Sequence, residues 1–195
     1  ARTKAGIIKK LKVENGKLKN NSQLSTLNPQ LIVVTGVKQP SVIKIVEDRC
    51  KEVGVKLYRL GKDFNFKIKE EGSLKGSVFD LTITRDRVLQ LNDLVLSLLG
   101  KHQVENASLA IKTVLELRGF GFKVSEEHIR QAIKTVFFRG RFELIKRRIT
   151  QNPTQKDAEV SVDQRIVSRS SANIILDGAH NPTKMKAFLV TLKDL

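Results

Sequence analysis

A continuous run of apolar, mostly β-branched residues, LIVVTG at 31–36, constrains the fold more than any other stretch. Such a run is typical of a strand buried on both faces, as in a parallel sheet. Pro40 and Ser41 then begin a helical pattern that ends at Gly54, and VKLYRL at 55–60 follows as a second strand. The predicted buried stripe of the helix contains Val42, Ile45, Val46, Cys50 and Val53. Strand, helix and strand make a βαβ unit with a right-handed crossover, which predicts an α/β fold.

After this unit the hydrophobic pattern changes to a period of two residues. FNFKIK at 64–69 and SVFDLTIT at 77–84 alternate apolar and polar residues, and Glu71 and Gly72 between them offer a turn. The alternation therefore predicts an antiparallel pair of strands inside the α/β fold.

Two helices are predicted next. The first covers residues 103–118 and ends at a pair of glycines. The second begins after Ser125, a favourable N-cap, with Glu126 and Glu127 in the first turn, where carboxylates interact well with the helix dipole. The predicted buried positions are Val104, Ala107, Ala110, Ile111, Val114 and Leu115 in the first helix and Ile129, Ala132, Ile133 and Val136 in the second.

Strand character returns at GRFELI, residues 140–145, and at NIIL, residues 173–176, which is predicted to be a buried strand. Residues 149–172 are polar and lack a clear apolar period, so they are interpreted as an exposed loop or an inserted hairpin. Pro182 opens a last helix. The apolar positions of that helix are Met185, Phe188, Leu189 and Leu192.

The charge of the chain suggests an anionic ligand. A formal net charge of +16 is common in proteins that bind polyanions. The basic residues are spread along helices and strands, however, and the few aromatic residues do not interleave with them as in proteins that stack bases. We therefore expect no specific nucleic-acid binding. Small anionic ligands such as nucleotide phosphates fit the net charge as well as a polyanion does. A noncatalytic basic module that binds RNA or DNA stays an alternative.

The single cysteine, Cys50, excludes an intramolecular disulfide and a cysteine-based metal site. The longest apolar run, LVLSLLG at 94–100, is too short to cross a bilayer, and the N-terminus has no signal-peptide pattern. These features predict a cytoplasmic protein without a membrane partner. The chain begins without methionine and stops within a helical pattern, so it is expected to be an internal piece of a longer protein.

Polar residues gather where predicted elements meet. DGAHNP at 177–182 follows a strand and opens a helix, which is where ligands bind in open α/β sheets. An aspartate there can accept hydrogen bonds from a ribose, and a histidine can donate to a phosphate. The simpler interpretation is that Asp177 and Asn181 shape a turn and cap the helix.

Two further clusters have the same character. GKHQVENASLA at 100–110 places His102 and Asn106 one turn apart on one helix face, and an asparagine amide can recognise adenine. FFRGRFE at 137–143 contains Gly140, predicted to break the preceding helix, and Arg141, whose planar guanidinium can clamp a phosphate. The simpler interpretations are donors satisfied at a helix start and an ordinary surface arginine.

Taken in order, KAGI at 4–7, GKHQVENASLA, RGRFE at 139–143 and DGAHNP resemble the folylpolyglutamate synthase and dihydrofolate synthase family of the Mur ligase superfamily. The resemblance covers nearly the whole chain, and HQ followed by NA favours the folate branch. It implies an α/β fold in which residues 1–136 are the C-terminal part of a Mur-ligase-type central ATP-binding domain. Residues 137–195 would be the linker and the beginning of a Rossmann-like C-terminal domain.

The resemblance also implies the chemistry of an ATP-dependent amide ligase. ATP would phosphorylate a folate or dihydropteroate carboxylate, and the amino group of L-glutamate would attack the acyl phosphate. The implied protein is a monomer that uses ATP and Mg²⁺, with the nucleotide between the two domains. Dihydrofolate synthase, folylpolyglutamate synthase and a bifunctional enzyme all fit. A Mur-type or cyanophycin-type amino-acid ligase is the alternative within enzymes.

Residue roles come from the same resemblance. Asn106 matches the asparagine at the adenine, Arg141 the linker arginine at the phosphates, Asp177 the aspartate at the ribose, and His180 the histidine near the phosphates. Lys4 matches a lysine that is carbamylated, and a carbamate supplies the oxygen ligands that Mg²⁺ prefers. No catalytic residue is assigned.

The chain departs from the family pattern in several places. No GxxxxGK[ST] phosphate loop occurs in it, so the chain by itself is expected to be inactive. FFRGR lacks the proline usual in the linker, which predicts a less rigid linker. The segment 149–172 is also longer than the segment that the family usually has between these motifs.

Overall fold

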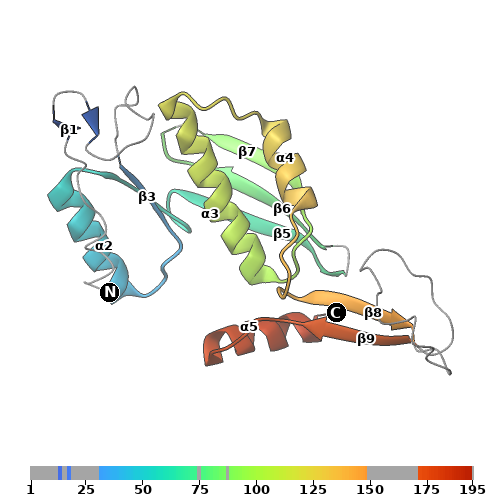
Figure 1. Cartoon of the computed structure of the whole chain (residues 1–195). Helices are drawn as coiled ribbons and strands as arrows, with labels where there is room; N and C mark the ends of the chain where they lie inside the picture. The colour runs from blue at the N-terminus through green and yellow to red at the C-terminus, as the bar shows by residue number, and fades with distance from the viewer. Residues whose placement is uncertain are drawn as a thin grey trace.

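The computed structural model describes residues 13–14, 17–18, 31–73, 76–86, 88–148 and 171–194. Figure 1 shows the elements in groups that follow the sequence, with the short β1 first, then β3 and α2, a sheet covered by α3 and α4 next, and β8, β9 and α5 last. The elements are β1 (Val13–Glu14), β2 (Lys17–Leu18), β3 (Ile32–Thr35), α2 (Pro40–Val53), β4 (Lys56–Arg59), β5 (Phe64–Ser73), β6 (Gly76–Ile83), β7 (Leu89–Leu96), α3 (Lys101–Leu117), a 3₁₀ turn (Arg118–Phe120), α4 (Glu126–Thr135), β8 (Glu143–Arg148), β9 (Ser171–Leu176) and α5 (Pro182–Lys193).

The predicted βαβ unit is confirmed. Strands β3 and β4 pair in parallel, and α2 begins at Pro40 and ends at Gly54, which adopts a left-handed φ of 71°. The predicted stripe of α2 is only partly right, because Ile43 is buried beside Cys50 while Val42 is half-buried. Strand β3 is half-buried along its length rather than buried on both faces, because β4 is its only partner among the described strands.

The antiparallel excursion is also confirmed, as the three-stranded sheet β5-β6-β7. The predicted turn at Glu71 and Gly72 is wrong, because β5 continues to Ser73, which pairs with Gly76. Strand β7 was not predicted. Its buried residues Leu91, Leu94 and Leu96 do not alternate strictly, because the register between β6 and β7 shifts after Phe79.

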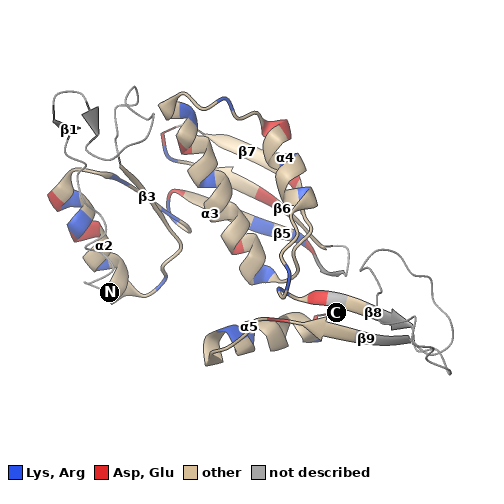
Figure 2. Cartoon of the chain, viewed as in Figure 1, with Lys and Arg blue, Asp and Glu red and all other residues tan. Residues whose placement is uncertain are grey.

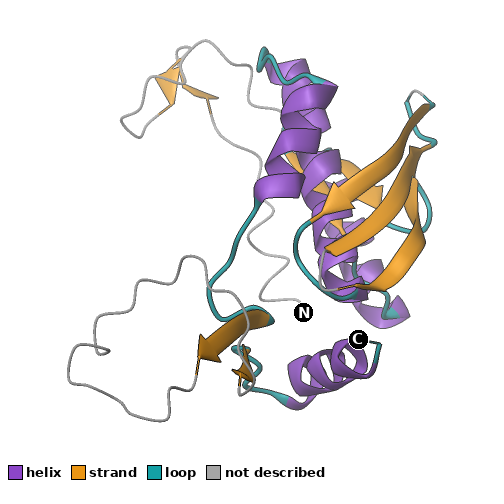
Figure 3. Ribbon diagram, turned by 90° about the vertical axis from the view of Figure 1, so that its right-hand side faces the viewer, coloured by secondary structure: helices purple, strands orange, loops and turns teal. Residues whose placement is uncertain are grey.

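Helices α3 and α4 cover one face of this sheet and form the hydrophobic core with it (Figure 3). Both helices were predicted, and the Ser125 N-cap is confirmed, since its Oγ accepts the His128 N–H at 3.1 Å. Two predicted core positions, Ala110 and Ala132, are exposed. Ser108 and Lys112 are buried instead, because α3 is packed against β3 as well as against the sheet.

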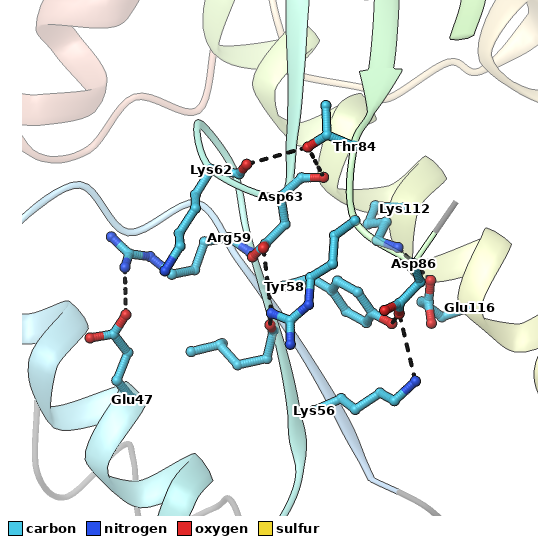
Figure 4. A network of polar contacts seen from close by, with 12 residues as sticks. Glu47, Lys56, Tyr58, Arg59, Lys62, Asp63, Thr84, Asp86, Lys112 and Glu116 are labelled. Carbon is cyan, nitrogen blue, oxygen red and sulfur yellow. Dashed lines mark hydrogen bonds and ion pairs between the residues drawn. The ribbon is translucent and has the colours of Figure 1, made fainter. Parts of the chain in front are cut away.

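A polar network ties β4 to the sheet and to α3 (Figure 4). The buried Asp63 accepts the Arg59 N–H at 2.8 Å, and its carbonyl accepts the Thr84 N–H at 3.0 Å. The fully buried Tyr58 donates its hydroxyl to Asp86, while Lys112 Nζ lies 3.7 Å from the Tyr58 ring centroid.

Burial and hydrogen bonds shift the pKa values of Tyr58 and Asp86 in this network. Burial, together with the hydrogen bond to Asp86 and the nearby Glu116 carboxylate, raises the pKa of Tyr58 far above its ordinary value. The hydrogen bond from Tyr58 lowers the pKa of Asp86. Tyr58 therefore stays a protonated donor and Asp86 an ionised acceptor, so the network holds the βαβ unit on the sheet.

The last part of the chain differs most from expectation. Helix α4 ends at Thr135, so the prediction that Gly140 breaks it is wrong, because Val136 is already extended. Strand β9 is present but not buried, with Ile174 and Leu176 41% and 44% exposed, since β8 is its only partner among the described strands. Of the predicted loop, residues 149–170 lie outside the described ranges and 171–172 belong to β9.

Helix α5 begins at Pro182 as predicted, but most of its apolar positions are exposed. These positions are Met185, Leu189 and Leu192. Phe188 packs against Phe142, with ring centroids 5.3 Å apart. Figure 2 shows lysine and arginine spread over the described helices and strands and mixed with acidic residues. Among the helices in the described ranges, none is long and apolar enough to cross a membrane.

Candidate functional site

The loop after β9 lies against the linker that precedes β8. The antiparallel register pairs Leu176 with Glu143, so Asp177 follows directly opposite Phe142. Asp177 Oδ2 accepts the Phe142 N–H at 2.9 Å, and the Gly178 N–H donates to the Gly140 carbonyl at 2.7 Å. Segments 35 residues apart are thereby joined.

The linker has an unusual backbone that these bonds stabilise. Gly140 and Phe142 both lie in the left-handed region, with φ of 66° and 51°. A phenylalanine rarely adopts that conformation, and here it is buried and packed on Phe188. The Gly140 N–H donates to Glu143 Oε2 at 2.8 Å. Hydrogen bonds on both sides of Arg141 thus hold the linker backbone.

Arg141 lies beside the loop after β9. Its Nη1 is 3.6 Å from the point where a Cβ on Gly178 would stand, and that Cβ would also lie 3.4 Å from the Gly140 carbonyl. Both distances are ordinary van der Waals contacts, so the linker lies directly against the loop. The guanidinium is half-exposed and forms no ion pair with a carboxylate in the described part of the chain.

The start of α3 faces the same place. His102 is half-buried, and burial lowers its pKa, with Asp177 raising it and Arg141 lowering it by their charges. A Cβ on Gly100 would overlap Thr191 Oγ1 of α5 and lie 3.0 Å from His102 Cε1. Gly100, with a φ of 96°, is thus where α5 meets α3. His102 was considered with the helix start but not chosen as a site residue, and only its position beside Asp177 and Arg141 indicates a role.

Asn106, His180 and Asn181 make local contacts near His102 and Asp177 in the sequence. Asn106 is exposed one turn beyond His102 and donates to Gln103 Oε1 at 3.3 Å. His180 is exposed, with Nδ1 2.9 Å from the Gly178 carbonyl. Asn181 caps α5, because its Oδ1 accepts the Lys184 N–H at 2.9 Å, so the capping interpretation is confirmed for this residue.

The structure therefore brings His102, Arg141 and Asp177 together at the linker. Within the described ranges no hydrogen bond joins Asn106 or His180 to them. Lys4 lies outside the described residues. The described residues include no group of three or more His, Cys, Asp or Glu side chains that could hold a metal ion.

The donors and acceptors at this centre suit a nucleotide. Asp177 uses one carboxylate oxygen on the linker, and the other makes no hydrogen bond to a described residue, so it can accept from a ribose hydroxyl. Arg141 offers a planar cation without a protein counter-ion in the described part, which suits phosphate. The exposed Asn106 amide can offer both a donor and an acceptor to a base edge.

Comparison with known proteins finds one similar sequence and several similar structures. No protein-family model matches the sequence. The chain is 30% identical to UDP-N-acetylmuramate–L-alanine ligase of Allorhizobium ampelinum over 132 residues, which is 66% of this chain. It is similar to the crystal structure of folylpolyglutamate synthase from Thermotoga maritima, with a TM-score of 0.60 and 29% identity over 88% of this chain. A folylpolyglutamate synthase complex with AMPPCP and folate matches 98% of the chain with a TM-score of 0.66 and 24% identity.

The chain spans only part of each of these proteins. It covers 22% of the alanine ligase, 34% of the Thermotoga synthase and 36% of the AMPPCP complex. The matches confirm the resemblance to the folylpolyglutamate synthases of the Mur ligase superfamily. They also confirm the α/β fold class with Mur-ligase-type domains.

Proposed function

We propose that this chain is the nucleotide-contacting part of an ATP-dependent amide ligase that adds L-glutamate to a folate or dihydropteroate carboxylate. The observation that supports it best is the junction of Asp177 with the linker that holds Arg141. Solved synthases with the same fold include a complex with an ATP analogue and folate. A ligase of this kind would be a cytoplasmic monomer.

The proposed reaction has two steps. A carboxylate oxygen of the folate or dihydropteroate attacks the γ-phosphorus of ATP, and ADP leaves. The amine of L-glutamate then attacks the carbonyl carbon of the acyl phosphate, phosphate leaves with its bridging oxygen, and the amine loses a proton. Arg141 would bind the phosphates and stabilise the charge that develops on them. Asn106 would contact the adenine, Asp177 the ribose, and His180 would lie near the phosphates.

The division into domains and the cation belong to the same proposal. Residues 1–136 would form the central-domain part, and 137–195 the linker and the beginning of the C-terminal domain. Closure of the second domain would exclude water from the acyl phosphate. Mg²⁺ would stabilise charge on the phosphates, and a carbamylated Lys4 would help to hold it.

A Mur-type ligase is the second candidate, because the alanine ligase match is 30% identical. That chemistry would use the same acyl phosphate with a different acceptor acid and amino acid. The cyanophycin-type ligase and the nucleic-acid module are the further alternatives, and a steep salt dependence of RNA or DNA binding would identify the last.

Incorporation of labelled glutamate tests the activity. The full-length protein that carries this chain, supplied with ATP and Mg²⁺, is expected to transfer label to folate, to dihydropteroate or to both. Parallel reactions with UDP-N-acetylmuramate and L-alanine test the second candidate. Label in neither folate nor dihydropteroate would defeat the proposed substrate class.

Replacement of Asp177 tests the ribose contact. Asp177→Ala is expected to raise the ATP concentration for half-maximal activity about tenfold or more, because a hydrogen bond to a charged group is lost. Asp177→Asn is the matched control, since its amide oxygen can still accept the Phe142 N–H. An unchanged ATP titration for both variants would limit Asp177 to holding the linker.

A further inference from the structure

His180 and Lys184 form a pair at the start of α5. Both nitrogens of the His180 ring are engaged, with Nδ1 2.9 Å from the Gly178 carbonyl and Nε2 3.2 Å from Lys184 Nζ. His180 lies two residues before α5 begins, and its contact with Lys184 spans the N-terminal end of that helix. Asn181 between them caps the helix and keeps the turn in place.

The bonds define the state of the imidazole. A carbonyl oxygen only accepts, so Nδ1 must carry the hydrogen that bonds the Gly178 carbonyl. An ammonium only donates, so Nε2 must be the unprotonated acceptor of Lys184. In this arrangement the His180 ring has no free N–H to give to a phosphate.

We propose that Lys184 is the phosphate-binding cation of this loop and that His180 is the residue that positions it. The inference rests on the proposed nucleotide site. The Lys184 ammonium has three hydrogens, and the bond to Nε2 uses one of them. The others remain for phosphate oxygens. Arg141 lies beside Gly178 and Lys184 contacts His180, so two cations lie next to residues of the loop after β9.

Charge alone does not single out Lys184, because Lys186 lies on the same helix. Lys186 is exposed, whereas Lys184 is half-buried. Lys186 also makes no hydrogen bond or ion pair with any described residue. Lys186→Met therefore removes the same charge from α5 without touching the pair, which makes it a matched control.

Nucleotide binding by the full-length protein tests the proposal, with ATP and adenosine as probes in calorimetry. Lys184→Met is expected to weaken ATP binding about tenfold, since a charged hydrogen bond is lost, and to leave adenosine binding unchanged. Lys186→Met should leave both unchanged. His180→Leu should weaken ATP binding like Lys184→Met, and His180→Gln, which keeps an acceptor, should restore most of it. The double variant Lys184→Met/His180→Leu should be no weaker than Lys184→Met alone.

Other results would contradict the proposal. If His180→Leu weakens ATP binding while Lys184→Met does not, His180 itself donates to the phosphate and the proposal is wrong. An equal loss from Lys186→Met would reduce the effect to general charge. Wild-type protein that binds neither ATP nor adenosine would overturn this inference together with the proposed function, whereas intact ATP binding in Lys184→Met overturns the inference alone.

Discussion

Arg141→Ala in the full-length protein is expected to lower kcat/KM for the ATP-dependent reaction about 10²–10³-fold, the typical cost of removing a group that stabilises transition-state charge. Its guanidinium has no carboxylate partner in the described part of the chain, so little structure depends on it. Its backbone is held by the bonds of Gly140 and Phe142 on either side. The loss should therefore appear in activity and not in thermal stability.

Arg139→Ala is the matched control for this experiment. Arg139 is an exposed arginine on the same linker, two residues earlier, and its removal changes the net charge equally. Arg141→Lys should recover only part of the activity, because an ammonium cannot bind phosphate bidentately. Similar small effects from Arg139→Ala and Arg141→Ala would show that Arg141 does not bind the phosphates.

Glu116→Ala is expected to destabilise the fold by about 3 kcal/mol, because it leaves a buried ammonium without its counter-ion. Lys112 is 2% exposed and pairs with Glu116 one turn further along α3, above the ring of Tyr58. The measurement is the free energy of unfolding in urea.

Two variants separate this effect from ordinary surface charge. Glu126→Ala breaks an exposed ion pair of the same spacing, Glu126 with Arg130 on α4, and should cost about 1 kcal/mol or less. Replacing both partners, as Lys112→Met/Glu116→Leu, should restore most of the stability, because no charge is then buried alone. If Glu116→Ala costs no more than Glu126→Ala, Lys112 is well solvated and the network does not stabilise the fold.

Local sequence signals predicted the elements well where neighbouring residues decide the structure. Pro40 and Gly54 bound α2, and Ser125 caps α4, because capping depends on residues within one turn. The turn at Glu71 and Gly72 and the unbroken alternation expected of the sheet failed for a different reason. Bulges and register shifts depend on the partner strand, which local pattern does not contain.

The residues of the candidate site were likewise only partly predictable from the sequence. The resemblance carried by four short motifs implied Asn106, Arg141, Asp177 and His180, and the chemistry of their side chains suits a nucleotide. The same reasoning did not assign His102 or Lys184 to the site. A histidine at a helix start and a lysine on a helix are common, and only their neighbours in space distinguish these two.

By itself, the sequence determined the α/β class, the βαβ unit and the identity of the polar loops, because these follow from short-range periodicity and from residue chemistry. The tertiary structure alone decided that Asp177 binds the linker backbone and that Lys112 is a buried cation. Both facts depend on pairing between segments far apart in the chain. The hydrogen bonds and desolvation that set such pairs arise only once the strands and helices have packed.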